Sequence, residues 1–529
     1  MSQRLKSMIT VSLSVLGSRV LGLLRDSLTA AFLGVSLASN AFIFAFMVPN
    51  LFRRMFGEGA LTSAFVPVLS EHAKEGDDER AFRFVNQVLL RLAILTVGVT
   101  IAFGVIFFLT DLGVRYAYGA NDFAEKPIAE QWSLGSRLSI LMMPYMPMIC
   151  LTAILGAVLN VRNRFAVPAL SNVLLNVGII SALVIGGMVR KLPTEELVWL
   201  LGWGVLAGGV LQLGTAMWAL WREGWRPRIE RGPVDGMDEL KRLFIPGLWG
   251  AAILQINILV SRLLAFGLNE TATTTLNYAN RLIELPMGIF AVSIATVIFP
   301  QMSLMVAAND REGLVESYGH GLRMTLALTV PAAVGLIVLN RPILQMLFQW
   351  GRFSAGDVEL TGPLLIILAA SVPLFAVSTF MTRGFHAFKD TKTPVKYAVV
   401  AFVVNVGFGA ALMIPLQAKG LALGNFLSAL AFTLCLGRGI LHKRPELGGI
   451  RIWKALGKIS IAALAMAVAA FSLSLGIELL MGTTKKAAFI SSGVVIPVGA
   501  ATYFAVLFAL KFEDSTEIAK LFKRFLKRG

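Results

Sequence analysis

Long apolar stretches follow one another along almost the whole of this chain, and they constrain its fold more than any other feature. A helix that crosses a membrane needs about 20 predominantly apolar residues, and fourteen such stretches can be marked in the sequence. Of the 529 residues, 56% are hydrophobic and 15% are charged, whereas soluble domains contain about 25% charged residues. The sequence therefore predicts an all-α polytopic membrane protein with fourteen transmembrane helices.

The expected spans fall into two consecutive groups of seven. They cover residues 8–34, 37–71, 81–110, 131–160, 166–189, 196–222 and 238–267, and then 271–306, 312–340, 357–388, 392–414, 419–442, 452–481 and 486–511. The first stretch is longer than the apolar core of a signal peptide and contains Arg19, Arg25 and Asp26. We therefore expect it to stay in the protein as the first span.

Lysine and arginine are distributed unevenly between the two sides that these spans define. Alternate connections, counted from the N-terminus, contain 29 Lys and Arg residues, and the other connections contain nine. Connections rich in Lys and Arg stay in the cytoplasm, which places both termini there, as an even number of spans requires. The net charge of +17 is thus a signal of topology and gives no reason to expect nucleic acid as a partner.

Short motifs recur at an offset of about 230 residues, which indicates an internal repeat. Phe65-Val-Pro-Val-Leu-Ser70 and Phe299-Pro-Gln-Met-Ser303 end the second and eighth spans, and Asn-Val-Gly recurs at Asn176 and Asn405. Two six-helix lobes related by a pseudo-two-fold axis along the membrane normal follow from such a repeat. The expected domains are residues 1–230 and 231–445, and then 446–529, which hold two extra C-terminal helices and a basic cytoplasmic tail. The alternative is chance similarity among Leu/Val-rich helices.

Ten of the 48 basic residues remain in the spans once the 29 and the nine of the connections are subtracted, and all ten are arginine. They are Arg19, Arg25, Arg53, Arg54, Arg91, Arg137, Arg262, Arg281, Arg323 and Arg383. An arginine at the centre of a span costs about 2.5–3.5 kcal/mol on the insertion scale. Only three acids clearly lie in the spans, namely Asp26, Glu58 and Glu284. These arginines therefore require other partners or a water-filled cavity.

Part of this charge has an ordinary structural explanation. Arginines near the ends of spans can extend to the headgroup region, as expected for Arg91, Arg323 and Arg383. Three arginines have an acid on the same face of their helix and could form an ion pair with it. These pairs are Arg19–Asp26, Arg54–Glu58 and Arg281–Glu284. Arg25 and Arg53 have no local partner.

Four of the arginines lie on the first, second and eighth spans, where the two repeats would form a transport site. They are Arg19, Arg25, Arg53 and Arg281. A planar guanidinium binds phosphate through two parallel hydrogen bonds and stays protonated when partly buried. If these four groups converge in one cavity, that cavity would select a multiply charged anion such as a pyrophosphate.

Proline and glycine occur in the same spans, as in helices that bend or break around a transport site. Pro49, Gly57 and Gly59 lie in the second span, and Pro286 and Gly288 lie in the eighth. The alternative is the ordinary enrichment of both residue types in membrane helices.

Several classes of function lack the residues that they need. Cys150 and Cys435 both lie in apolar runs, and the four histidines are scattered, so we expect neither a disulfide framework nor a metal site. An exporter of cationic drugs would use intramembrane carboxylates, and a membrane enzyme would use catalytic acids, histidines or metal ligands. A scaffold without a transport cycle would not need a buried cationic cavity. The composition of the spans favours a transporter of an anionic substrate.

Four motifs resemble those of one transporter family. They are Ser18-Arg-Val-Leu-Gly-Leu-Leu-Arg-Asp26, Pro49-Asn-Leu-Phe-Arg-Arg-Met-Phe-Gly-Glu-Gly59, Ala64-Phe-Val-Pro67 and Tyr278-Ala-Asn-Arg-Leu-Ile-Glu-Leu-Pro286. The chain resembles, essentially end to end, the MurJ (MviN) family of bacterial lipid II flippases, within the multidrug/oligosaccharidyl-lipid/polysaccharide exporter superfamily. The resemblance implies two lobes that form a V around a cationic cavity, with a groove for the polyprenyl tail at the two extra helices.

The resemblance also implies a substrate and its site. The substrate would be lipid II, the undecaprenyl diphosphate that carries the disaccharide-pentapeptide, moved to the outer leaflet of the bacterial cytoplasmic membrane for peptidoglycan synthesis. The expected partners are lipid II and membrane lipids, and the protein is expected to be a monomer. It would be a transporter and not an enzyme, it would need no cofactor, and the membrane potential would help to drive transport. The substrate-binding residues would be Arg19, Arg25, Arg53 and Arg281, supported by Arg54, Asp26, Glu58 and Glu284.

This sequence departs from some relatives at three positions. Asn40, Met47 and Asn280 stand where those relatives have Asp, Lys and Asp, and the seventh span has no carboxylate to hold a cation. Coupling to an ion is therefore unsupported. A flippase for another polyprenyl-diphosphate-linked glycan remains the alternative function, because only the family motifs argue against it.

Overall fold

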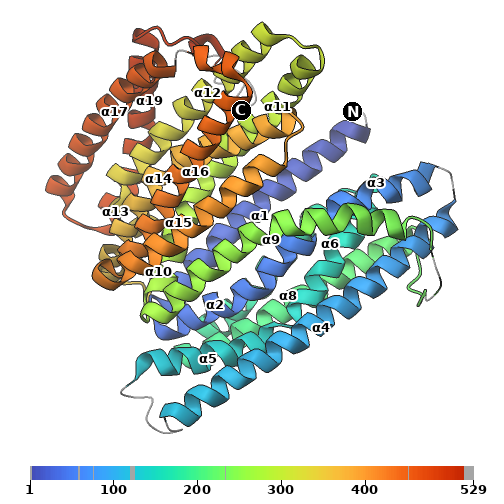
Figure 1. Ribbon diagram of the computed structural model, residues 1–529. Helices are drawn as coiled ribbons and strands as arrows, with labels where there is room; N and C mark the ends of the chain where they lie inside the picture. Colours follow the sequence, from blue (N-terminus) through green and yellow to red (C-terminus); the bar gives the residue numbers. More distant parts are fainter. Residues whose placement is uncertain are drawn as a thin grey trace. The chain divides into compact units, whose positions relative to one another are not determined.

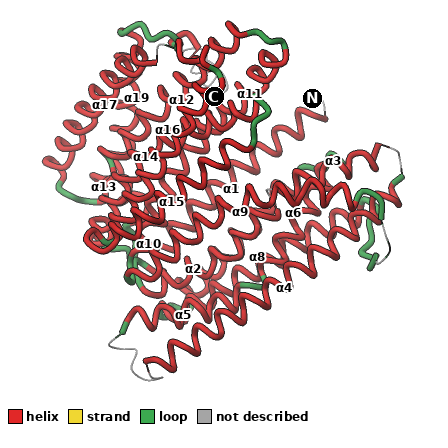
Figure 2. The backbone as a smooth tube through the Cα atoms, viewed as in Figure 1, coloured by secondary structure: helices red, strands yellow, loops and turns green. Residues whose placement is uncertain are grey.

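Helices make up the regular structure of this protein. The computed structural model describes residues 3–57, 60–74, 77–118, 126–230, 232, 234–450 and 452–517. In this part of the chain every regular element is helical and no strand occurs, as Figure 2 shows. The prediction of an all-α protein is confirmed.

Contacts between the helices divide the chain into two compact units, and Figure 1 labels many of their helices. The first unit consists of Met1–Thr274 and Trp350–Phe353. Its elements are α1 (Gln3–Leu33), α2 (Leu37–Phe52), η1 (Arg53–Gly57), α3 (Ala60–Lys74), α4 (Asp78–Tyr118), α5 (Pro127–Met142), α6 (Tyr145–Val161), α7 (Ala166–Leu183), η3 (Val184–Val189), α8 (Thr194–Arg222) and α9 (Met237–Leu268).

The second unit consists of Thr275–Gln349 and Ser354–Gly529. Its elements are α10 (Ala272–Pro286), which starts at the end of the first unit, η4 (Met287–Ala291), α11 (Val292–Ala307), α12 (Arg311–Val338), α13 (Asn340–Phe348), α14 (Ala355–Ala387), α15 (Lys392–Leu416), α16 (Ala418–Lys443), η5 (Pro445–Gly449), α17 (Ile452–Met481), α18 (Lys485–Ile490), η6 (Ser491–Val495) and α19 (Ile496–Ala509). The expected lobes rest on the sequence repeat, which is a different criterion from contacts, and they stay a prediction.

Ten helical segments in the described residues are long and apolar enough to cross a membrane. They are Asp78–Tyr118, Ala166–Val189, Thr194–Arg222, Ala272–Ala307, Arg311–Val338, Ala355–Ala387, Lys392–Leu416, Ala418–Lys443, Ile452–Met481 and Lys485–Ala509. An eleventh consists of α5 and α6, which meet at a bend of 42°. Pro144 lies in this break and cannot continue the backbone hydrogen bonding of a helix. The protein is thus a multi-pass membrane protein.

The helices that carry Arg53 and Arg281 are both interrupted. In the first unit Pro49 lies inside α2, and the π-helical turn η1 begins at Arg53. In the second unit Pro286 ends α10, and the π-helical turn η4 follows it. Proline removes a backbone donor and crowds the preceding turn, and π-helical turns inside α-helices are frequent at functional sites. Both of these proline-containing spans are thus interrupted by a π-helical turn.

Glycines bring two neighbouring helices close together in each unit. A methyl group added to Gly178 of α7 would lie 2.5 Å from the carbonyl oxygen of Gly204 in α8. In the second unit a methyl group on Gly424 of α16 would lie 2.7 Å from the backbone N and Cα of Gly409 in α15. Small residues at such crossings let the backbones approach, which is a main source of helix association in membranes.

The last two spans form a hairpin, Ile452–Ala509, that packs on α12 (Figure 1, red). Ile459 and Met466 of α17 share a buried core with Leu507 of α19. Tyr503 of α19 is fully buried, and its hydroxyl donates a hydrogen bond of 2.8 Å to the carbonyl oxygen of Ala327 in α12. We call this pair of spans the C-terminal hairpin.

The substitution Gly424→Ala is expected to destabilise the protein by about 1–3 kcal/mol, because its methyl group meets backbone atoms that cannot move aside. Gly407→Ala is the matched control, since Gly407 lies in the same helix pair and has no atom within 4 Å of an added methyl group. Alanine there raises helix propensity by at most about 1 kcal/mol. Thermal unfolding of both variants in detergent measures the difference, and equal shifts would contradict the close approach of α15 and α16.

Candidate functional site

Three elements of the first unit bring two of the predicted arginines to one face of α7. Arg25 of α1 donates from Nη1 to Oδ1 of Asn176, at 3.0 Å. Arg53 of η1 donates from Nη1 to Oδ1 of Asn172, at 3.2 Å. The two asparagines are four residues apart, so their side chains lie one above the other along α7. We call Arg25, Asp26, Arg53, Asn172 and Asn176 the α7 cluster.

Arg25 also forms an ion pair with the next residue in the chain. Its Nε and Nη2 both donate to Oδ1 of Asp26, at 3.0 Å and 2.7 Å, and the two side chains are 13% and 11% exposed. The prediction that Arg25 has no local partner is therefore wrong. Adjacent residues point apart on a helix, but the long arginine side chain folds back onto the neighbouring carboxylate.

The asparagines are functional candidates that the sequence did not reveal. Asn176 is 4% exposed, and its Nδ2 also donates to the carbonyl oxygen of Ser18 on α1, at 3.4 Å. An amide oxygen accepts a hydrogen bond from guanidinium while carrying no charge. Within its own five residues, the α7 cluster holds two guanidinium groups and one carboxylate, and a carboxylate at Asn176 would balance them. Two amides four residues apart on an apolar span are the signal that could have pointed to them.

The other predicted residues of the first unit are placed less closely. Arg19 is exposed on α1 and makes no hydrogen bond or ion pair with another described residue. Arg54 is exposed on η1, and its expected partner Glu58 lies outside the described residues. The expected pair of Arg19 with Asp26 is therefore wrong, because the Asp26 carboxylate pairs with the adjacent Arg25.

Arg281 lies on α10, in the second unit. Its Nη1 lies 2.9 Å from Oε2 of Glu284, three residues later, and the two side chains are 37% and 54% exposed. The ion pair expected from this spacing is confirmed. Whether Arg281 converges with the arginines of the first unit stays a prediction.

Asn40 and Asn280 are two of the positions at which this sequence departs from some relatives. Both side-chain amides have hydrogen-bond partners within the protein. Asn40 is fully buried, and its Nδ2 donates at 3.0 Å to both Gln131 Oε1 and the Asn269 carbonyl oxygen. Its Oδ1 accepts from the Thr274 backbone N–H at 2.8 Å. Asn280 donates to the carbonyl oxygen of Leu276 at 2.7 Å. Asn40 thus joins α2 to α5 and to the turn before α10, whereas Asn280 bonds within α10, and neither amide is an acid that could relay a proton.

Metal ligation has no counterpart in the described residues, where no three His, Cys, Asp or Glu side chains come together. The remaining arginines with described contacts have other surroundings: Arg137 stacks over the Trp199 ring at 5.1 Å, and Arg323 pairs with Asp514 at 2.7 Å. In the first unit, the described contacts of guanidinium with side-chain amides are those of the α7 cluster.

Known proteins resemble this chain along most of its length. The family model described as lipid II flippase MurJ matches residues 29–491. The probable lipid II flippase MurJ of Vibrio cholerae is 33% identical over 520 residues, which cover 96% of each chain. The protein of the same name from Haemophilus influenzae is 32% identical and covers 80% of this chain and 83% of its own.

Solved structures agree with the sequence relatives. A lipid II flippase MurJ in an inward closed conformation superposes with a TM-score of 0.76 at 26% identity, covering 96% of this chain and 99% of that one. An inward-facing multidrug resistance MATE transporter of the MOP superfamily has a TM-score of 0.64 at 16% identity, over 82% of this chain and 95% of its own, which shows a common fold. With a family model that covers most of its length and relatives aligned nearly end to end, the chain belongs to the MurJ family of lipid II flippases.

Proposed function

We propose that this protein moves lipid II from the cytoplasmic to the outer leaflet of the bacterial cytoplasmic membrane by alternating access. The observation that carries the proposal is the family match over residues 29–491. Flipping breaks and forms no covalent bond, so the protein acts as a transporter and requires no catalytic residue. The lipid II delivered in this way serves peptidoglycan synthesis and thereby cell shape.

The proposed topology has fourteen spans with both termini in the cytoplasm. Besides the eleven apolar segments above, the helices α1, α2–α3 and α9 supply the remaining three expected spans. The excess of Lys and Arg in alternate connections supports the orientation. The interruptions at η1 and η4, about 230 residues apart, support two related lobes at 1–230 and 231–445, followed by 446–529.

The diphosphate of lipid II is the group that the arginines would bind. Arg19, Arg25, Arg53 and Arg281 form the proposed binding set, with Arg54, Asp26, Glu58 and Glu284 in supporting roles. Guanidinium and phosphate form parallel charge-assisted hydrogen bonds, which are strong in a site of low dielectric constant. The excess of guanidinium over carboxylate within the α7 cluster supports this role, because its amide acceptors add no negative charge.

Release requires that binding stay moderate. Asp26 lies beside Arg25 and Glu284 lies beside Arg281, and each carboxylate reduces the local positive potential. A diphosphate must therefore compete with these carboxylates for the guanidinium groups. The membrane potential supplies about 2.3 kcal/mol per charge per 100 mV for outward movement of an anionic headgroup. Such a cycle needs no cofactor, and the tail of the lipid stays in the bilayer beside the C-terminal hairpin. We propose that the protein works as a monomer.

A flippase for another polyprenyl-diphosphate-linked glycan is the alternative, since the arginines would bind the same diphosphate. Vesicles that contain the purified protein and fluorescent lipid II provide the test, read by the fraction of headgroups accessible to an external quencher. Protein-dependent reorientation of lipid II supports the proposal. If the protein reorients a different undecaprenyl-diphosphate glycan and not lipid II, the alternative function is supported and the proposal is wrong.

Arg25→Ala and Arg281→Ala are expected to abolish flipping in these vesicles while the protein still inserts and folds. Each change removes charge-assisted hydrogen bonds worth about 1.5–3 kcal/mol each, which corresponds to about tenfold to a hundredfold weaker headgroup binding. Arg341→Ala is the control, because Arg341 forms an exposed ion pair with Glu359. Normal flipping by either of the first two variants would remove the role of that arginine.

Lysine at the same two positions separates geometry from charge. Lysine keeps the positive charge but lacks the planar pair of donors that matches a phosphate. We expect Arg25→Lys and Arg281→Lys to bind lipid II more weakly than the parent protein, measured by titration in detergent. Equal affinity would mean that a point charge is sufficient.

Asn176→Asp is expected to weaken lipid II binding more than Asn176→Leu does. Aspartate keeps the hydrogen bond with Arg25 but cancels its charge, whereas leucine removes the hydrogen bond and leaves the charge in place. Asn160→Asp, at an exposed position on α6, controls for the added negative charge. Titration with lipid II in detergent measures the affinity of each variant. Weaker binding by Asn176→Leu than by Asn176→Asp would show that the orientation of Arg25 matters more than the net charge around it.

A further inference from the structure

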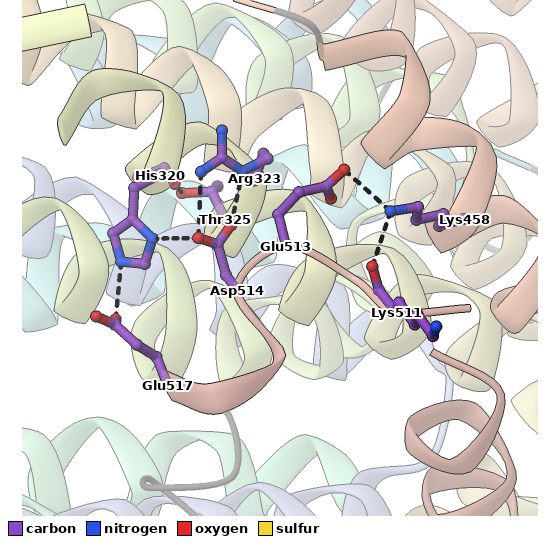
Figure 3. Close-up of polar contacts among 9 residues, drawn as sticks. His320, Arg323, Thr325, Lys458, Lys511, Glu513, Asp514 and Glu517 are labelled. Atoms are coloured by element: carbon purple, nitrogen blue, oxygen red, sulfur yellow. Dashed lines mark hydrogen bonds and ion pairs between the residues drawn. The ribbon is translucent and has the colours of Figure 1, made fainter. Parts of the chain in front are cut away.

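The segment that follows α19 is fixed by a buried carboxylate outside the α7 cluster. Asp514 is 8% exposed, although it lies after α19. Arg323 of α12 donates to both of its oxygens, from Nε to Oδ2 at 2.7 Å and from Nη2 to Oδ1 at 3.1 Å. His320, also on α12, places Nδ1 at 2.7 Å from Oδ1. Figure 3 shows both side chains directed at this carboxylate.

Neighbouring residues hold the same end of the chain at two further points. Oε2 of Glu517 lies 2.9 Å from Nε2 of His320. Lys458 of α17 donates from Nζ to the carbonyl oxygen of Lys511 at 2.9 Å and to Oε1 of Glu513 at 3.0 Å (Figure 3). Residues 511–517, which we call the C-terminal anchor, are thus tied to α12 and to α17. The anchor fixes the end of the C-terminal hairpin on the helix against which the hairpin packs.

The two contacts of His320 require a particular protonation state. A carboxylate only accepts hydrogen bonds, and a neutral imidazole has one donor nitrogen. Because each ring nitrogen of His320 lies within hydrogen-bond distance of a carboxylate oxygen, both contacts are satisfied together only by the doubly protonated imidazolium. When the ring loses a proton, one of the two contacts becomes a repulsion between lone pairs.

The charged groups around His320 determine which contact is lost. Asp514, Glu517 and Arg323 act on the ring directly. Burial raises the pKa of the Asp514 carboxyl, but its hydrogen bonds with His320 and Arg323 outweigh burial and hold that pKa below its ordinary value. Asp514 therefore stays ionised and continues to accept a hydrogen bond from the one N–H that remains on the His320 ring. Glu517 is 56% exposed, and water can replace its contact with the ring.

More distant charges leave this choice unchanged. Glu513 is occupied by Lys458 of α17, and Glu316 on α12 acts on Arg323. Glu513 is therefore paired with a cation, and neither carboxylate is among the groups that act on the imidazole ring. The exposed side of the anchor, at Glu517, is the part that responds to proton loss, while Asp514 and Arg323 stay paired.

We infer that Asp514 is a positioning residue, which docks the C-terminal hairpin on α12 through Arg323 and His320, and that the proton on His320 sets how firmly the C-terminal anchor is held. The anchor is tight at acidic pH and loosens at Glu517 as the pH rises. Its consequence for transport rests on the proposed function, because the lipid tail is placed beside this hairpin. A loosened hairpin slows the movement of the lipid and leaves headgroup binding unchanged.

Hydrogen exchange of the full-length protein in lipid nanodiscs tests the anchor without substrate. The readout is the exchange rate of residues 511–517 between about pH 5.5 and about pH 8.5, divided by the intrinsic rate at each pH. In the parent protein the corrected rate is expected to rise about twofold to fivefold over this range, as for the loss of an exposed ion pair. A corrected rate that does not change with pH would overturn the proton dependence.

Two variants and a control separate this mechanism from a general loss of structure. Glu517→Gln is expected to flatten the pH profile, because a side-chain amide pairs with the ring in either protonation state. Asp514→Asn is expected to raise exchange at every pH by about tenfold or more, since it leaves Arg323 without its carboxylate. Glu359→Gln, at the exposed pair with Arg341, should keep the parent profile. An unaltered profile in Glu517→Gln, or unaltered exchange in Asp514→Asn, would contradict the proposal.

Transport provides the second readout. In the vesicle assay Asp514→Asn is expected to slow lipid II flipping about tenfold with unchanged affinity for lipid II, as for a step that depends on hairpin position. Normal flipping despite a loosened anchor would overturn the positioning role and leave the flippase assignment intact. Absence of flipping by the parent protein would instead remove the proposed function, while the exchange results still decide whether the anchor exists.

Discussion

A guanidinium group among apolar helices is tolerated only when its donors find acceptors, and the kind of acceptor decides what the arginine can do. Arg323 is held by the carboxylate of Asp514 at 2.7 Å, so its charge is cancelled and its role is to fix one helix end on another. Arg53 donates to the amide of Asn172, and Arg25 shares its donors between Asp26 and the amide of Asn176. Amide oxygens orient these groups and add no negative charge of their own, as the proposed binding of a diphosphate requires.

Close packing of glycines holds this arrangement in place. Gly178 follows Asn176 by two residues on α7, and a methyl group there would meet the backbone of Gly204 and Gly208 on α8. The side of α7 that carries Gly178 is therefore fixed against α8, while Asn176 reaches across to α1. Since α7 cannot shift without opening this contact, the two asparagines present their oxygens at defined positions. The packing of α7 against α8 therefore also determines how Arg25 and Arg53 are oriented.

The sequence predicted the helices well because a span is recorded in the hydropathy of its own residues. It also predicted the pair of Arg281 with Glu284, since partners three residues apart share a helix face. It did not predict the partner of Arg25, because helical geometry alone disfavours contact between adjacent residues. The contacts of Arg25 with Asn176 and of Arg323 with Asp514 join residues far apart in the chain, and only the fold reveals them. Convergence of the arginines from both units is a question that neither hydropathy nor spacing within one span can answer.

The interrupted helices suit a protein that must change shape around charged residues. In a π-helical turn the backbone hydrogen bonds run from residue i to i+5, which frees backbone groups and rotates the side chains that follow. One such turn begins at Arg53 itself, and the other begins six residues after Arg281. A small change in either turn would reorient a guanidinium group without moving the rest of its unit. Interruptions next to arginines would couple local backbone rearrangement to the position of positive charge, as the proposed binding and release of a diphosphate requires.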